Sequence, residues 1–307
     1  MSWSESIDWF LAQARVEMGY SSLTLEAYAH ELTRYVQYLE REHRLTHVAQ
    51  VETTHLHGFM IELIETYRLG EFSQARALSA LRTFHRYAVR EEWASENPAA
   101  LLDLPRLHRK LPAILGVEEV EQLIAACDEP GPLGLRNTAM VELLYASGLR
   151  VSELVHVQPI HLDLEEGWVR VMGKGRRERI TPMGQPAIDA LRTYLSEGRP
   201  QLVGEGQQIP YVFLNRYGNR LSRQSVFLLI QQKAREAGIT KTVGPHTLRH
   251  CFATHLIENG ADLVAVRDLL GHASIATTEI YVHTDARRLR EVVDRYHPLS
   301  HSAYPRG

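Results

Sequence analysis

Apolar residues in the first 95 positions recur at the three- and four-residue spacing of amphipathic helices. Four such stripes follow one another: Ile7, Phe10, Leu11 and Ala14; Leu25, Tyr28, Leu32, Tyr35, Val36 and Leu39; residues 54–69; and residues 73–93. Gly19 is expected to end the first helix, because glycine is favoured just past a helix terminus. The pattern therefore predicts an all-α domain over residues 1–95.

One later segment changes from helical to alternating periodicity. Residues 168–172 alternate apolar and polar positions, Gly173-Lys-Gly175 follows, and residues 178–182 form a second run. This order predicts a β-hairpin with Lys174 at or near its tip. Helical patterns surround it at 117–126, 135–146, 185–197, 222–237, 247–259, 262–270 and 284–296. The expected fold is mainly α with a small β-sheet, in which an α+β domain follows the helical one.

Closely spaced prolines separate the two parts of the chain. Pro98, Pro105 and Pro112 resist helix formation, and the basic residues Arg109 and Lys110 lie in the same stretch. A basic linker is suited to lie along a polyanion. We therefore expect an N-terminal domain at 1–95, a linker at 96–112 and a second domain at 113–307.

Net charge does not indicate a nucleic-acid binder at first sight. The chain of 307 residues carries 34 basic and 37 acidic side chains, a net charge of −3. Any DNA site must therefore be a local basic face. On the predicted fourth helix, Arg82, Arg86 and Arg90 repeat every four residues and share one face. A solvated charged face and a row of phosphate contacts both explain this stripe.

The apolar runs, the N-terminal segment and the cysteine content indicate in which compartment the protein is found. No apolar run reaches transmembrane length, and the N-terminus lacks the basic and apolar regions of a signal peptide. The two cysteines, Cys127 and Cys251, are too few for a disulfide framework and fit a reducing compartment. We therefore expect a cytoplasmic protein without a membrane partner.

Residues able to act on a phosphodiester occur in a fixed order. They stand in four short segments: Gly148-Leu-Arg150-Val-Ser-Glu153, His246-Thr-Leu-Arg249-His250, Leu270-Gly-His272 and Thr278-Glu-Ile-Tyr281. Arginine binds phosphate oxygens through a planar fork, histidine moves protons, and a tyrosine hydroxyl can attack phosphorus. Taken together, these residue types predict chemistry on a phosphodiester.

Each of these residues also has an ordinary structural explanation. Arg150 could be a surface arginine paired with Glu153, and His272 and Tyr281 could be a cap and a core residue. Lys174, with Arg176, Arg177 and Arg179 behind it, could form a soluble hairpin edge. Their joint occurrence favours the chemical interpretation.

The segment 247–258 is expected to be a helix with Leu248, Phe252 and Leu256 on its buried side. At about 100° per residue, Arg249 should lie off that side, on the flank of His246. His246 and His250 also have the spacing of helical zinc pairs. However, no acidic residue lies between them and Arg249 would repel a cation, so we expect no metal.

The order Arg150, Lys174, His246, Arg249, His272, Tyr281 resembles the catalytic signature of the tyrosine recombinase (phage integrase) family. The surrounding segments Ala146-Ser-Gly-Leu-Arg-Val-Ser-Glu-Leu154, Gly173-Lys-Gly175 and Leu269-Leu-Gly-His272 are similar to the Xer branch of that family, particularly its XerD-like members. The resemblance covers nearly the whole chain, since the N-terminal helices also look like those of the branch.

The resemblance implies that Tyr281 attacks the scissile phosphate and forms a 3′-phosphotyrosyl link. Lys174 would then protonate the leaving 5′-oxygen, and His272 would hydrogen-bond a non-bridging oxygen. Attack by the 5′-hydroxyl of another strand reverses the step, so no cofactor is needed.

The resemblance also implies roles for the remaining site residues. Arg150 and Arg249 would clamp the non-bridging oxygens, where negative charge is stabilised in the transition state. His246 would act as an acid, base or hydrogen bonder, and Glu153 would orient Arg150 from behind.

The implied partner is double-stranded DNA carrying a recombination site, which the two domains would enclose as a C-shaped clamp. Expected DNA-contact residues are Arg82, Arg86, Arg90, Arg109, Lys110, Arg176 and Arg177. A homo- or hetero-tetramer on two sites would pass through a Holliday junction, with a paralogous recombinase and a septal DNA translocase as further partners.

The expected role is resolution of chromosome dimers at a dif-like site, and the alternative is a phage or mobile-element integrase or excisionase. Two other classes stay open. One is a relaxase or nuclease that uses tyrosine without strand exchange, a chemistry that type IB topoisomerases share, and the other is an accessory DNA-binding protein that has lost catalysis.

Overall fold

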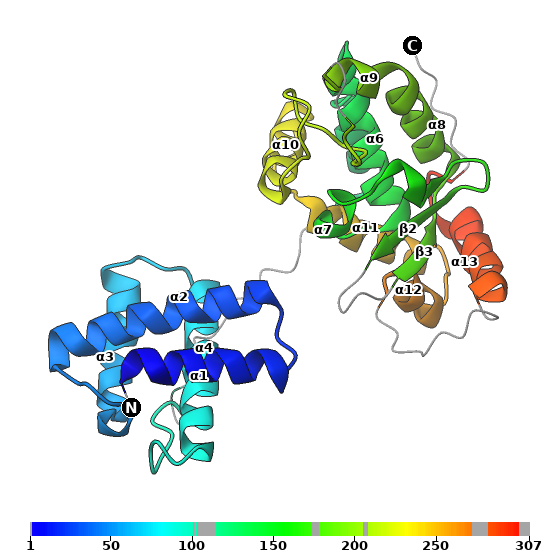
Figure 1. Cartoon of the computed structure of the whole chain (residues 1–307). Helices are drawn as coiled ribbons and strands as arrows, with labels where there is room; N and C mark the ends of the chain where they lie inside the picture. The colour runs from blue at the N-terminus through cyan, green and yellow to red at the C-terminus, as the bar shows by residue number, and fades with distance from the viewer. Residues whose placement is uncertain are drawn as a thin grey trace. The chain divides into compact units, whose positions relative to one another are not determined.

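The computed structural model describes residues 2–100, 102, 114–172, 178–204, 208–271 and 282–300, without the side chains of 282–286. The chain divides into two compact units, Met1–Arg109 and Lys110–Gly307, which Figure 1 shows together. Each unit has its own apolar core.

The first unit is built from four helices, as the sequence predicts. They are α1 (Trp3–Val16), α2 (Ser22–Tyr38), α3 (Thr53–Glu65) and α4 (Glu71–Arg90), with a π-helical turn at Leu39–His43 and a 3₁₀ turn at Val48–Gln50. Their apolar stripes meet in a core that includes Phe10, Leu32, Phe59, Leu81 and Phe84, all fully buried. Burial of these stripes, more than local propensity, holds helices of this length.

Two helices of this unit end earlier than the apolar pattern predicted. The prediction extended α3 to residue 69 and α4 to residue 93. The structure closes them with left-handed residues, Arg68 at φ 49° and Glu92 at φ 60°. Beyond α4, the Trp93 N–H turns back to the Ala88 carbonyl at 2.8 Å, a hydrogen bond that ends a helix and satisfies its terminal carbonyls.

The second unit is mainly helical around a three-stranded antiparallel sheet, so the predicted fold class is confirmed. Its helices are α5 (Val117–Ala125), α6 (Pro132–Ser147), α7 (Val151–Leu154), α8 (Gln185–Thr193), α9 (Arg199–Leu202), α10 (Arg223–Glu236), α11 (Pro245–Glu258), α12 (Leu263–Leu269) and α13 (Val282–Tyr296). A 3₁₀ turn at Pro159–His161 precedes the sheet, and a π-helical turn at Tyr194–Gly198 joins α8 to α9.

The sheet has the order β1-β2-β3, with β1 at Leu162–Asp163, β2 at Trp168–Met172 and β3 at Glu178–Pro182. The two strands of the predicted hairpin are confirmed, with Trp168 opposite Pro182 and Met172 opposite Glu178. Its turn, which carries Lys174, lies outside the described residues. Strand β1 was not predicted, because two residues are too few to show alternation.

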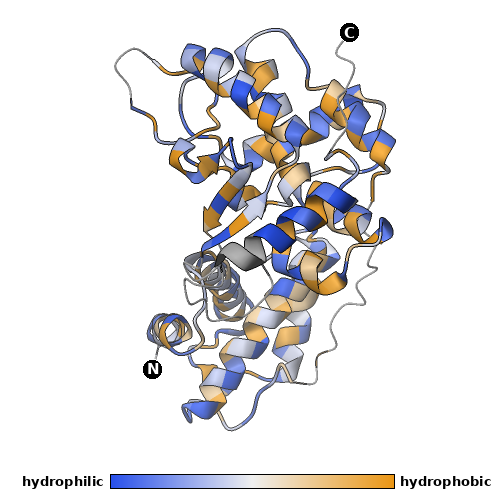
Figure 2. Ribbon diagram, turned by 90° about the vertical axis from the view of Figure 1, so that its right-hand side faces the viewer, coloured by the Kyte–Doolittle hydropathy of each residue, from blue (hydrophilic) through white to orange (hydrophobic). Residues whose placement is uncertain are grey.

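Helix α6 is the central element of the second unit. All of its residues from Ala139 to Ser147 are buried, which is expected of a helical segment covered on every side. Helices α8 and α11 pack on it. The outer helices instead carry both hydrophilic and hydrophobic residues, as the colours of Figure 2 show. No helix in the part of the chain that the structure describes is long and apolar enough to cross a membrane.

A buried histidine makes the first unit sensitive to acid. His85 of α4 lies 3.1 Å from the Tyr35 hydroxyl, and burial lowers its pKa to about 3. In an unfolded chain a histidine titrates near pH ~6.5, so the unfolded state takes up the proton first. The stability associated with neutral His85 is therefore present above about pH 6.5 and is lost as the pH falls toward 3.

We expect the free energy of unfolding to decrease between about pH 6.5 and pH 4, and to decrease less steeply in His85→Gln by up to about 1.4 kcal/mol per pH unit. Urea titrations followed by circular dichroism at several pH values measure this slope. His57→Gln changes an exposed histidine of α3 and should keep the wild-type slope. The same slope in His85→Gln would contradict the assignment.

Candidate active site

Arg150 stands at the entrance of α7, directly after the turn that ends α6. It has extended backbone dihedrals, φ −73° and ψ 147°, and is the N-cap of α7. Glu153 reaches back from the third position of α7, where its Oε2 accepts the Arg150 backbone N–H at 2.7 Å. A carboxylate at a helix N-terminus satisfies an otherwise free donor. The local sequence thus places Glu153 beside Arg150.

The turn before Arg150 requires glycine. Gly148 has a φ of 58°, and a Cβ at this position would lie 2.5 Å from Cδ1 of Phe252. Both the left-handed backbone and the close approach of α11 therefore exclude a side chain here. The Gly148 carbonyl is left facing the site, where it accepts a hydrogen bond from Arg249.

The Glu153 carboxylate joins two arginines. Its Oε1 accepts from Arg150 Nη1 at 2.9 Å and from Arg179 Nη1 at 2.7 Å. Its Oε2 accepts from Arg179 Nη2 at 3.1 Å. The Glu153 side chain is only 2% exposed, whereas that of Arg150 is 36% exposed. Of this group, Arg150 therefore faces an incoming ligand.

Arg249 approaches the same point from α11, but not in the way that we predicted. The prediction placed it off the buried side of its helix, on the flank of His246. In the structure Arg249 is buried and His246, in the first turn of α11, is exposed. The difference arises because the Gly148 turn and the end of α12 cover Arg249, which donates to the carbonyls of Gly148 and Leu270.

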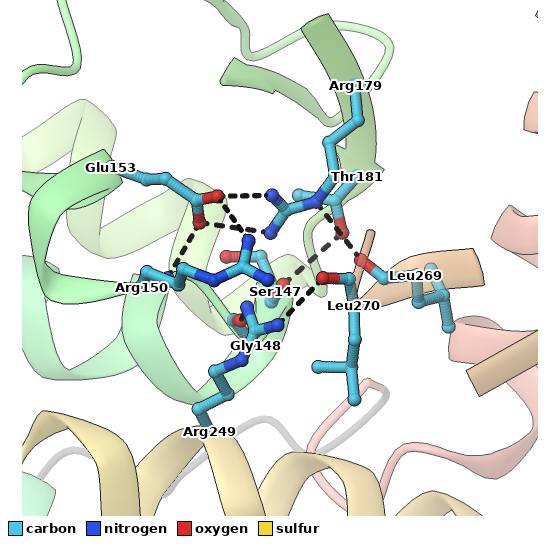
Figure 3. Close-up of polar contacts among 9 residues, drawn as sticks. All are labelled: Ser147, Gly148, Arg150, Glu153, Arg179, Thr181, Arg249, Leu269 and Leu270. Carbon is cyan, nitrogen blue, oxygen red and sulfur yellow. Dashed lines mark hydrogen bonds and ion pairs between the residues drawn. The ribbon is translucent and has the colours of Figure 1, made fainter. Parts of the chain in front are cut away.

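Two carbonyls fix the Arg249 guanidinium. Nη1 donates to the Gly148 carbonyl at 2.6 Å and Nη2 to the Leu270 carbonyl at 2.7 Å. Burial, followed by the nearby charges of Arg150 and Arg179, lowers the pKa of Arg249 to about 10. Arg249 therefore stays charged at neutral pH. Figure 3 shows the three guanidinium groups converging from three different elements.

The cluster also holds the end of α12. Arg179 Nε donates to the Leu269 carbonyl at 3.3 Å, next to the carbonyl that Arg249 binds. Gly271 follows at φ 70°, and a Cβ there would lie 2.8 Å from Cδ of Arg179. The chain that leads to His272 is thus anchored by two arginines.

The structure brings together only part of the predicted site. Arg150, Glu153 and Arg249 form one cluster, and His246 lies on the same helix as Arg249. Seven further predicted site residues, Arg109, Lys110, Lys174, Arg176, Arg177, His272 and Tyr281, lie outside the described residues. Their placement rests on the sequence pattern alone.

Arg179 was missed as a site residue. The sequence analysis grouped it with the basic residues of the hairpin edge. Period-two alternation along β3 was the available signal, because it places Arg179 on the same face as Thr181, which is fully buried. An arginine on the inward face of a strand requires an acidic or carbonyl partner.

The three arginines of the predicted stripe on α4 differ in their surroundings. Arg82 is half-buried and donates to the carbonyls of Ala99, at 3.2 Å, and Leu102. Arg90 pairs with Glu17 and Glu91 at 2.9 and 3.0 Å. Arg86 is exposed. Because Arg82 already has protein acceptors, Arg86 is the member most open to an external anion.

A cavity of about 610 Å³ opens beside Arg150. Its wall includes Arg150, Glu153, His156, His161 and Arg170. The adjoining cluster contains three arginines and one glutamate, an excess of positive charge next to open space. Guanidinium groups in this arrangement bind phosphate or carboxylate oxygens. Among the described residues no group of histidine, cysteine and acidic side chains is arranged to hold a metal ion.

Comparison with known proteins identifies relatives of both units. The model described as "Phage integrase family" matches residues 114–288, and the one described as "Phage integrase, N-terminal SAM-like domain" matches residues 7–92. "Tyrosine recombinase XerD" of Staphylococcus aureus is 42% identical over 292 residues, covering 95% of this chain and 98% of the relative. The XerD of Halalkalibacterium halodurans is 41% identical over 295 residues, 96% and 98% of the two chains.

Solved structures share the fold. The Tn1549 transposon integrase in complex with transposon right end DNA aligns with a TM-score of 0.70 at 17% identity, covering 94% of this chain and 99% of that one. The XerH recombinase bound to difH substrate aligns with a TM-score of 0.65 at 22% identity, covering 93% and 84%. A lambda integrase dimer bound to a COC′ core site aligns with a TM-score of 0.67 at 18% identity, covering 91% and 100%.

The Gly148 turn yields a stability prediction. Gly148→Ala should lower the free energy of unfolding by about 2–4 kcal/mol, because it adds a steric clash to left-handed strain. Gly238→Ala is a matched control, since Gly238 also has a positive φ, 74°, but its Cβ would meet nothing within 4 Å. Urea unfolding of both variants separates clash from strain. Equal losses would show that the approach of Phe252 has no energetic weight.

Proposed function

We propose that this chain, which belongs to the phage integrase family, is a site-specific tyrosine recombinase that cuts and rejoins DNA. One observation of the structure supports this most directly. Arg150 lines an open cavity, and Arg249 from α11 lies close to Arg150 and Arg179, so that positive charge exceeds negative charge around them. Such a site suits a phosphate whose charge increases during attack.

The reaction that we propose is a transesterification. The Tyr281 hydroxyl oxygen attacks the scissile phosphorus, a new phosphorus–oxygen bond forms, and the bond to the 5′-oxygen breaks. Lys174 donates the proton that this oxygen takes up, and His246 acts as the base that accepts the proton of the Tyr281 hydroxyl. One phosphodiester replaces another, so the bond energy is retained for rejoining and the reaction needs no nucleotide cofactor.

Arg150 and Arg249 would share the stabilisation of the pentavalent transition state. Arg249 is already held by two backbone carbonyls, and Arg150 by Glu153. Donors fixed in this way require little reorganisation when charge develops. His246, exposed at the start of α11, would exchange a proton or a hydrogen bond with the reacting oxygens, and His272 would bind a non-bridging oxygen.

In the cell the substrate would be a dif-like site, and the role resolution of chromosome dimers in the cytoplasm. The support comes from the relatives: XerD proteins match nearly the whole chain, and the XerH structure contains difH DNA. We propose a tetramer on two sites, formed with a paralogous recombinase or with copies of this chain, and control by a septal DNA translocase. If the protein recombines the ends of a mobile element and not dif-like sites, its role is instead that of a phage or mobile-element integrase or excisionase.

Trapping the covalent intermediate tests the reaction. On a nicked suicide substrate carrying a dif-like site, the wild-type chain should form a 3′-linked adduct that migrates slowly on a denaturing gel. Tyr281→Phe should bind the same DNA and form no adduct, because it lacks the attacking oxygen. Tyr67→Phe, which alters a partly exposed tyrosine of the first unit, should behave as wild type. An adduct in Tyr281→Phe would show that another residue is the nucleophile.

The α4 arginines provide a test of DNA binding by the first unit. Arg86→Gln should reduce the slope of log affinity against log salt by about 1, as expected for one lost phosphate contact, with unchanged stability. Arg82→Gln should instead lower the free energy of unfolding by about 1–2 kcal/mol, because it leaves buried carbonyls without donors. Filter binding over a salt series and urea unfolding measure the two effects. Equal salt slopes for wild type and Arg86→Gln would rule out this contact.

A further inference from the structure

The charge balance around Glu153 is the starting point of this inference. Alone with Glu153, Arg150 would be one half of a neutral ion pair at the mouth of the cavity. Arg179 contributes a second positive charge to the same carboxylate, through two hydrogen bonds of 2.7 and 3.1 Å. The trio therefore retains a net positive charge where Arg150 meets solvent.

The geometry of the trio leaves Glu153 little freedom. Its two oxygens receive four donors: the Arg150 side chain and backbone N–H, and both terminal nitrogens of Arg179. A bidentate fork on a nearly fully buried carboxylate fixes its rotamer. The position of Arg150 is thus determined from behind by a residue that does not itself open onto the solvent, since the Arg179 side chain is 13% exposed.

Arg179 also connects the two sides of the site. Its Nε donates to the Leu269 carbonyl at 3.3 Å, beside the Leu270 carbonyl that holds Arg249. It therefore links the β-hairpin and α7 to the end of α12. A shift of Arg179 would displace Arg150 and the backbone acceptor neighbouring that of Arg249 together.

We infer that Arg179 is a positioning residue for strand cleavage, which acts through Glu153 to keep Arg150 oriented toward the scissile phosphate and offsets the negative charge of the Glu153 carboxylate. The inference rests on the proposed function. Arg179 would not touch the DNA. Its loss should slow cleavage within the bound complex while leaving DNA affinity nearly unchanged.

Three variants test this inference in the full-length chain. Arg179→Met should slow adduct formation by about 100-fold in the preformed complex, similar to the loss of an oriented transition-state donor. Arg179→Lys should lose only about 10-fold, because it restores the charge without the fork. Arg192→Met is the matched control, since Arg192 of α8 is half exposed and pairs with Asp189 away from the site. It should cleave at the wild-type rate.

A double-mutant cycle distinguishes positioning from general destabilisation. If Arg179 acts through Glu153, adding Arg179→Met to Glu153→Gln should slow cleavage by less than about threefold beyond Glu153→Gln alone. Effects that multiply would show that Arg179 acts independently of Glu153 and would overturn the inference. Thermal unfolding of each variant checks that all are folded, and Arg179→Lys carries the test if Arg179→Met is not.

A measurement with inorganic phosphate separates this inference from the proposed function. Phosphate should raise the thermal midpoint of wild type and Arg192→Met more than that of Arg179→Met, because binding to the folded state stabilises it. If phosphate raises the thermal midpoint of wild type more than that of Arg179→Met, but the chain forms no adduct, the recombinase proposal is overturned and the role of Arg179 in phosphate binding stands. If both wild type and Arg179→Met form the adduct at equal rates and phosphate raises their thermal midpoints equally, the role of Arg179 is overturned and the recombinase proposal stands.

Discussion

The site of the second unit depends on the hydrogen bonds that the Glu153 carboxylate accepts from Arg150 and Arg179. Arg150, Arg179 and Arg249 would repel one another if they were brought together without an anion. Glu153 is the acidic side chain that the structure places among them, and it accepts hydrogen bonds from two of them. The backbone carbonyls of Gly148 and Leu270 supply the remaining negative partial charge, to Arg249. A concentrated positive site can therefore exist in the folded chain before any DNA is bound.

Several features of the fold follow from gathering these groups at one point. The turn after α6 must pass close to α11, and only glycine at position 148 allows this. The sheet packs so that Arg179 leaves β3 toward α7, and α12 ends where its last carbonyls meet two guanidinium groups. Helix α6, whose residues Ala139–Ser147 are buried, packs against α11, α7 and β3, which carry the site, and also against α8. The packing of the core therefore also determines where the site residues lie.

Much of this architecture could be predicted from the sequence. Helical periodicity located the main helices and alternation located the hairpin. The pairing of Arg150 with Glu153 was expected both as an ordinary ion pair and from the resemblance to the family. Burial of Arg249 could not be predicted, because it depends on the Gly148 turn and the end of α12, which are distant in sequence. Arg179 was missed for a related reason: alternation shows which way a strand residue points, but not which acid from another element it will meet.

Arg150 and Arg249, which we propose clamp the phosphate, are held in physically different ways. Arg249 is buried and bonded to backbone, so its position is set by the fold and its charge is fixed at neutral pH despite a lowered pKa. Arg150 is partly exposed and bonded to a side chain, so its position can respond to the carboxylate that holds it. A chain with a net charge of −3 can still bind a polyanion at such a point, because local potential and not total charge acts at short range. The position of Glu153 therefore determines the position of Arg150, whereas Arg249 is fixed by the backbone.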